Sequence, residues 1–200
     1  MRSRLAFASV ILLAATLLGP PEPARSQVPG TAPRPTRGID WAAAARGQAL
    51  GGRALVLGRG LDRGQIDRTA IPILLPMDPA LLKGMTLHST GNWYVLNSKI
   101  PGALVTLEGT ERTDPAPASV AGKFGKDGPG GLTVDRITTG WRASWTRFGV
   151  LYVAEIECDD LRSKSPCMAE SRIRGIVGSM TAVVLGKAAK ARAQAAGVAA

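Results

Sequence analysis

The chain has 200 residues, and its 25 Lys and Arg against 15 Asp and Glu give a net charge of +10. Its 45% hydrophobic and 20% charged residues lie near the globular average, which excludes a wholly disordered chain and a coiled coil. At this length one domain of ordinary size is expected. A single His and two Cys leave little from which to build the usual catalytic or metal-binding sites. We therefore expect no cofactor and no metal site.

Residues 1–26 have the pattern of a secretory signal peptide. Arg2 and Arg4 precede an apolar run that ends at Leu18 and is followed by Gly and Pro. The run has 14 residues, fewer than the roughly 20 that a membrane-spanning helix needs. Cleavage is expected before Gln27, with an earlier site between residues 15 and 19 and a retained anchor as the alternatives. The sequence thus predicts a periplasmic or secreted protein without a transmembrane span in the mature chain.

Residues 27–68 are rich in Pro and Gly and are expected to be a linker. Asp40 stands where a helix N-cap would, ahead of Trp41 and four Ala, so a short helix is expected from Trp41 to about Leu50. The glycines at positions 47, 51 and 52 weaken that helix. Removal of residues 1–26 takes away three Arg and one Glu, which leaves a mature charge of +8.

An α+β domain is expected over residues 69–186, built on an antiparallel sheet of about five strands. Strands are predicted near residues 71–75, 92–97 and 102–108, and residues 109–131 are expected to form a long loop. The clearest pattern is a hairpin over residues 132–157, in which alternate residues are apolar from Ile137 to Ile156. It predicts that Trp141, Trp145, Tyr152 and Ile156 share one face.

The residues after Cys167 are expected to cover that face. An approximate helical stripe predicts a helix packed on the sheet, and residues 181–185 are expected to form a last strand. Residues 187–200 have no apolar stripe and are predicted to be a flexible, basic, Ala-rich tail. The stripe of the predicted helix consists of Met168, Ile173, Ile176, Val177 and Met180.

The two cysteines, Cys158 and Cys167, are nine residues apart and are predicted to form a disulfide. An even pair in an exported protein favours a structural bond, and the spacing is not the CxxC of redox proteins. A metal site at these cysteines would need two more ligands, and His88 is the only His in the chain.

His88 precedes Ser89 and follows Asp78 by ten residues, so a hydrolase triad could be assembled from these types. No GxSxG sequence accompanies them, and a surface or strand-end His is the simpler interpretation. The pairs Glu155 with Glu157 and Asp159 with Asp160 are interpreted as solvated charges. The glycines near residues 58–64 and 122–131 fit neither the dinucleotide fingerprint nor a P-loop.

No catalytic residue and no binding residue is assigned from the sequence. The function class expected is an exported, non-catalytic protein that binds an envelope partner or an anionic surface. A secreted hydrolase of another type is the alternative, and nucleic acid is not an expected partner of an exported protein. Attraction to an anionic surface would come from dispersed basic residues: Arg53, Arg59, Arg63, Arg68, Lys123, Lys126, Lys187, Lys190 and Arg192.

Overall fold

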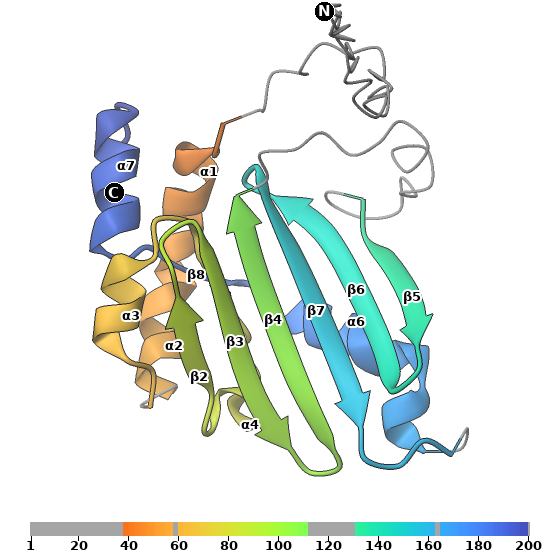
Figure 1. Ribbon diagram of the computed structural model, residues 1–200. Helices are drawn as coiled ribbons and strands as arrows, with labels where there is room; N and C mark the ends of the chain where they lie inside the picture. Colours follow the sequence, from red (N-terminus) through yellow and green to blue (C-terminus); the bar gives the residue numbers. More distant parts are fainter. Residues whose placement is uncertain (1–37, 58–59, 112–130, 163–164, 200) are drawn as a thin grey trace, which may run out of the picture. The chain divides into compact units, whose positions relative to one another are not determined.

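The computed structural model describes residues 38–57, 60–111, 131–162 and 165–199 (Figure 1). The predicted signal peptide and most of the predicted loop at 109–131 lie outside these residues. Within the described ranges, no helix is long and apolar enough to cross a membrane.

The main element is a six-stranded antiparallel sheet with the order β2-β3-β4-β7-β6-β5 (Figure 1). The predicted α+β class with an antiparallel sheet is confirmed, but the main sheet has six strands where about five were expected, and the predicted strands near 71–75 and 181–185 form a separate two-stranded sheet. Sequential hairpins pair β2 with β3, β3 with β4, β5 with β6 and β6 with β7. The strands are β2 (Thr86–Ser89), β3 (Trp93–Ile100), β4 (Ala103–Glu111), β5 (Thr133–Ile137), β6 (Gly140–Arg147) and β7 (Val150–Cys158).

The hairpin of β6 and β7 places the predicted residues on one face. Trp145 lies opposite Tyr152 and Trp141 opposite Ile156, so these four side chains share one face. The turn between the strands is tight because Phe148 and Gly149 both adopt positive φ, at 56° and 78°. Two such residues in succession match the twist of the flanking strands.

The predicted first strand of this hairpin is wrong at its beginning. Ile137 pairs with Gly140, and residues 138 and 139 form a turn between β5 and β6. The alternation through Ile137 and Thr139 therefore crosses a chain reversal. A Thr-Thr turn lacks the Asn or Gly that usually marks a two-residue hairpin, so this reversal has no strong sequence signal.

One face of the sheet is covered by α6 (Glu170–Ser179), as the apolar stripe predicts. Ile173 and Ile176 are buried, and the helix contacts β6 and β7. At the start of this segment, the indole N–H of Trp141 donates to the carbonyl of Met168 at 3.0 Å. The ribbon in Figure 1 places α6 behind the sheet, on the side away from the viewer.

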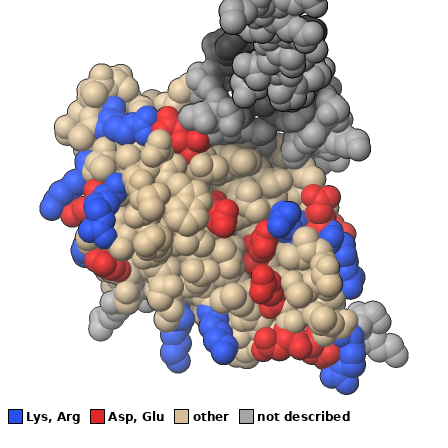
Figure 2. Space-filling view, in the orientation of Figure 1, with Lys and Arg blue, Asp and Glu red and all other residues tan. Residues whose placement is uncertain are grey.

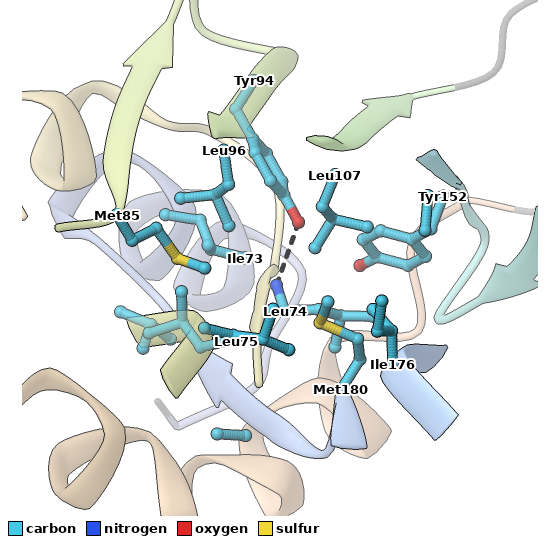
Figure 3. Close-up of a cluster of buried hydrophobic side chains, with 14 of the residues drawn as sticks. Ile73, Leu74, Leu75, Met85, Tyr94, Leu96, Leu107, Tyr152, Ile176 and Met180 are labelled. Atoms are coloured by element: carbon cyan, nitrogen blue, oxygen red, sulfur yellow. Dashed lines mark hydrogen bonds between the residues drawn. The ribbon is translucent and has the colours of Figure 1, made fainter. Parts of the chain in front are cut away.

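A second, two-stranded sheet of β1 (Ile73–Leu75) and β8 (Ala182–Val184) lies in the core beneath the same face. Two buried tyrosines of the main sheet satisfy backbone groups of the β1 segment. The hydroxyl of Tyr94 accepts a hydrogen bond from the Leu74 N–H at 3.0 Å, and that of Tyr152 donates to the Pro72 carbonyl at 3.0 Å. Figure 3 shows the Tyr94 bond inside the apolar cluster. These bonds satisfy groups that would be costly to bury without partners.

Gly109 makes room for these two rings. It lies opposite Tyr94 on β3 and opposite Tyr152 on β7. A Cβ at Gly109 would overlap the ring of Tyr94. The absence of a side chain here lets the Tyr94 ring lie across β4, with its hydroxyl on β1.

Residues 38–57 and 60–68 are more ordered than the predicted linker with its single short helix. They form α1 (Trp41–Arg46), the 3-10 helix η1 (Gly47–Leu50), α2 (Gly51–Leu57) and α3 (Arg63–Arg68). Trp41, Ala44, Ala54 and Ile66 belong to the core. The Asp40 carboxylate accepts from the Ala43 N–H at 2.9 Å, which confirms the predicted N-cap.

The glycines that weaken this helical segment have a packing role. A Cβ at Gly47 would overlap the side chain of Val183 on β8, and one at Gly51 would overlap the Val183 carbonyl. Glycine therefore allows β8 to approach the helices closely. A lower helix propensity is the cost of this contact.

The predicted flexible tail is instead α7 (Lys187–Ala195), which packs on α3. Ala189 and Ala193, four residues apart, are fully buried. The buried face of α7 has no large apolar side chain, because two alanines are enough to fill the contact where helices approach closely. Gly186 confirms the close approach, since a Cβ there would overlap the backbone of Ile66.

Candidate functional site

The cysteines form the predicted disulfide. Cys158 and Cys167 are bonded, with their Cα atoms 5.8 Å apart. The bond joins the end of β7 to η2 (Pro166–Met168), directly before α6. Its position fixes the covering helix to the sheet, which is a structural task.

The structure does not assemble a triad from His88, Ser89 and Asp78. His88 is exposed on one face of β2, whereas Ser89 is buried on the other. The Ser89 hydroxyl donates to the Trp93 carbonyl at 3.2 Å, and the Asp78 carboxylate caps α4 (Pro79–Leu82) by accepting from the Ala80 N–H. Each of the three side chains thus has a place that separates it from the other two.

The opposite face of the six-stranded sheet, which we call the open face, has no described helix packed on it. Its residues alternate with the buried ones along β3, β4, β6 and β7 and are half-buried or exposed. An antiparallel sheet commonly has one face on the core and one in water. The apolar residues of the open face are Trp93, Val95, Leu104, Ile137, Leu151 and Val153.

Carboxylates form a diagonal line across the middle of the open face. Glu108 on β4 lies opposite Val153, so Glu155 is its diagonal neighbour on β7, and Glu157 follows two residues later. Diagonal cross-strand neighbours are about 7–8 Å apart, and alternate residues of one strand about 6.8 Å. We call these three residues the glutamate line. Figure 2 shows acidic side chains over the middle of this face and most basic ones towards its margins.

Two further groups extend the glutamate line. At one end, Trp93 on β3 lies opposite Thr110 and is therefore the diagonal neighbour of Glu108. Its ring meets that of His88 edge-on, with centroids 6.3 Å apart. On the other side, the Arg142 guanidinium binds Glu155 at 2.5 Å. Of the three glutamates, only Glu155 has an ion-pair partner among the described residues.

Glu155 and Glu157 both lie on the open face of β7, which agrees with their predicted position on a solvated strand face. Asp160 pairs with Arg162 in the disulfide loop, and hydrogen bonds from Arg162 lower the pKa of this carboxyl. Asp159 directly follows the end of β7, two residues after Glu157, and its N–H donates to the Gly102 carbonyl at 3.0 Å. Sequence reasoning missed the line because Glu108 joins it only through the register of β4 and β7.

Two of the predicted surface cations form ion pairs within the protein. Arg192 donates to both oxygens of Glu111 at 2.8 and 2.9 Å and to the Ala70 carbonyl, and it lies over the Trp41 ring. Its hydrogen bonds lower the pKa of Glu111. Lys187 pairs with Asp67 at 3.0 Å and lowers the pKa of that carboxyl. Lys123, Lys126 and Arg59 lie outside the described residues.

Comparison of the chain with protein-family models, with curated proteins and with solved structures found no match in any of the three. The described part of the chain contains no cluster of three or more His, Cys, Asp or Glu side chains placed to hold a metal ion. The candidate site is the open face, because its geometry brings Trp93 and the glutamate line together.

Proposed function

We propose that this chain is an exported, non-catalytic protein that binds a partner in the cell envelope through the open face of its sheet. The observation that carries the proposal is the open face itself, where tryptophan, aliphatic and carboxylate side chains lie together on one rigid surface. Export rests on the signal-like pattern of residues 1–26, and the disulfide is consistent with an oxidising compartment.

The size of the open face suits a protein partner. The six strands are spaced about 4.8 Å apart and have four to nine residues each, so a mean length of about seven residues gives a surface of roughly 24 by 24 Å. The area is on the order of 600 Å², somewhat below the roughly 800 Å² per partner of a standard interface. Tryptophan is also enriched at the centres of such interfaces.

The charge on this face favours a protein partner over an anionic surface. Its centre is acidic, and Arg192 and Lys187 are already paired with carboxylates. An anionic lipid or wall polymer would meet Glu108, Glu155 and Glu157 on this face. We therefore favour the first of the two partner classes expected from the sequence.

Photo-crosslinking in the cells that make the protein tests the proposal. A photoreactive amino acid at Val153, on the open face, is expected to give a discrete adduct with an envelope protein. The same group at Arg172, exposed on α6, is the matched control and should give no such adduct. Equal adducts from both positions, or none from Val153, would contradict binding through the open face.

A further inference from the structure

The spacing of the carboxylates on the open face, and not only their charge, indicates what this face binds. The three glutamates follow one another at steps of about 7 Å, set by the register of β4 and β7. An extended polypeptide places alternate side chains on one side at nearly the same interval, about 6.8 Å. Successive carboxylates of the glutamate line would thus meet residues i, i+2 and i+4 of an extended segment.

We infer that the open face binds an extended segment of a partner protein with Lys or Arg at alternate positions. This inference rests on the proposed function and names the partner's chemistry. The ammonium or guanidinium groups would pair with Glu108, Glu155 and Glu157. The contrast with the net charge of +10 on the whole chain makes the acidic centre of this face distinctive.

Two other features of the face fit the same occupant. Trp93, at the end of the glutamate line, offers a ring to a fourth cation, an interaction that Trp makes better than Tyr or Phe. Val95, Leu151 and Val153 lie between and beside the glutamates and can contact the aliphatic stems of Lys and Arg. An all-acidic surface would provide no such apolar contact.

Arg142 reduces the attraction that one member of the glutamate line has for a cation. It already neutralises Glu155, so an incoming cation must share that carboxylate. Glu108 and Glu157, both exposed, then contribute most of the attraction. Gly140, opposite Glu157 on β6, places no side chain beside that carboxylate.

Calorimetric titration of the full chain with synthetic peptides tests the inference. The probe is a ten-residue peptide of alternating Lys and Ser. A peptide of five Lys followed by five Ser has the same composition, and an alternating Glu and Ser peptide has the opposite charge. We expect the alternating Lys peptide to bind at low salt, at least several-fold more tightly than the block peptide, and to weaken as salt screens exposed charges. The alternating Glu peptide should not bind.

Two variants with the same charge change localise the binding. Glu108→Gln/Glu155→Gln/Glu157→Gln should weaken binding of the alternating Lys peptide roughly tenfold, chiefly through loss of the exposed pairs at Glu108 and Glu157. The control Asp62→Asn/Asp160→Asn/Glu170→Gln removes three carboxylates that lie outside the six strands and should change binding less than about twofold.

The outcomes separate this inference from the proposed function. Equal binding of the block peptide, equal weakening by both variants, or no binding at millimolar peptide would overturn the inference. If crosslinks from Val153 persist in any of those cases, the open face still binds a partner of other chemistry. Loss of both the peptide binding and the Val153 crosslinks would overturn both proposals. Cosedimentation of the wild-type chain and the control variant alike with anionic vesicles would favour the anionic surface instead.

Discussion

The two faces of the six-stranded sheet are built from the same strands and differ in nearly every other respect. On β7, Tyr152 and Ile156 are fully buried against helices and the two-stranded sheet of β1 and β8, which we call the inner sheet. Val153 and Glu155 of the same strand lie on the open face. Because side chains alternate along a strand, each face can be changed without altering the other. The contrast places stability on the covered face, and it is at the open face that we propose recognition.

The largest difference between the faces should appear on truncation of aliphatic residues. Ile156→Ala, on the covered face, is expected to lower the free energy of unfolding by about 2–5 kcal/mol, since it leaves a cavity in the core. Val153→Ala, three residues away on the open face, should lower it by less than about 1 kcal/mol. Denaturant unfolding monitored by circular dichroism measures both. Similar losses would contradict the assignment of stability to one face.

Loss of the disulfide should weaken the attachment of α6 to the covered face. Cys158→Ala/Cys167→Ala opens a loop of about ten residues, which on the chain-entropy model lowers the free energy of unfolding by about 2.7 kcal/mol. The same unfolding experiment measures the loss, and the wild-type chain under reducing conditions is the control. An unchanged midpoint in both would show that the bond has no part in holding the helix.

Removal of one hydroxyl tests how the inner sheet is held. Tyr94→Phe leaves the Leu74 N–H without its hydrogen-bond acceptor in the core, which is expected to cost about 1–3 kcal/mol. Tyr152→Phe removes the donor to the Pro72 carbonyl and serves as the companion variant. Thermal unfolding at constant pH measures both, and midpoints equal to that of the wild type would argue against the tyrosine contacts with the β1 segment.

The smallest effect is expected at acidic pH, where Glu111 binds Arg192. The pKa of Glu111 is lowered in the folded protein, so its contribution to stability is complete above the ordinary value of 4.5 and is lost as pH falls through the folded pKa. Glu111→Gln should therefore be less stable than wild type near pH 6 and equal to it at the acid limit. Arg192→Met should behave alike, and a pH-independent difference would contradict this pairing.

Alternation in the sequence predicted the covered face well. Trp141, Trp145, Tyr152 and Ile156 share a face, the helix stripe covers it, and Cys158 bonds Cys167. These features succeed because each depends on short-range periodicity or on a single pair of residues. The turn at residues 138 and 139 was not predicted because its residue types are not those of common turns.

Features that depend on distant pairing could not be predicted in this way. Gly47 and Gly51 read as helix breakers until Val183, more than one hundred residues away, is seen to lie against them. Nothing in the sequence around Ala189 and Ala193 indicates that they pack against α3. The glutamate line requires the register of β4 against β7, two strands that residues 112–149 separate along the chain.

Chemical shift mapping of side-chain methyl groups during a titration with the alternating Lys and Ser peptide tests the open face most directly. If the peptide binds at the open face, the methyls of Val95, Leu104, Leu151 and Val153 are expected to shift with peptide concentration. Those of Val105 and Leu107, in the core beneath the same strands, should shift far less. Shifts confined to the exposed helical residues Leu50 and Val56, with the open-face methyls unmoved, would contradict binding at the open face.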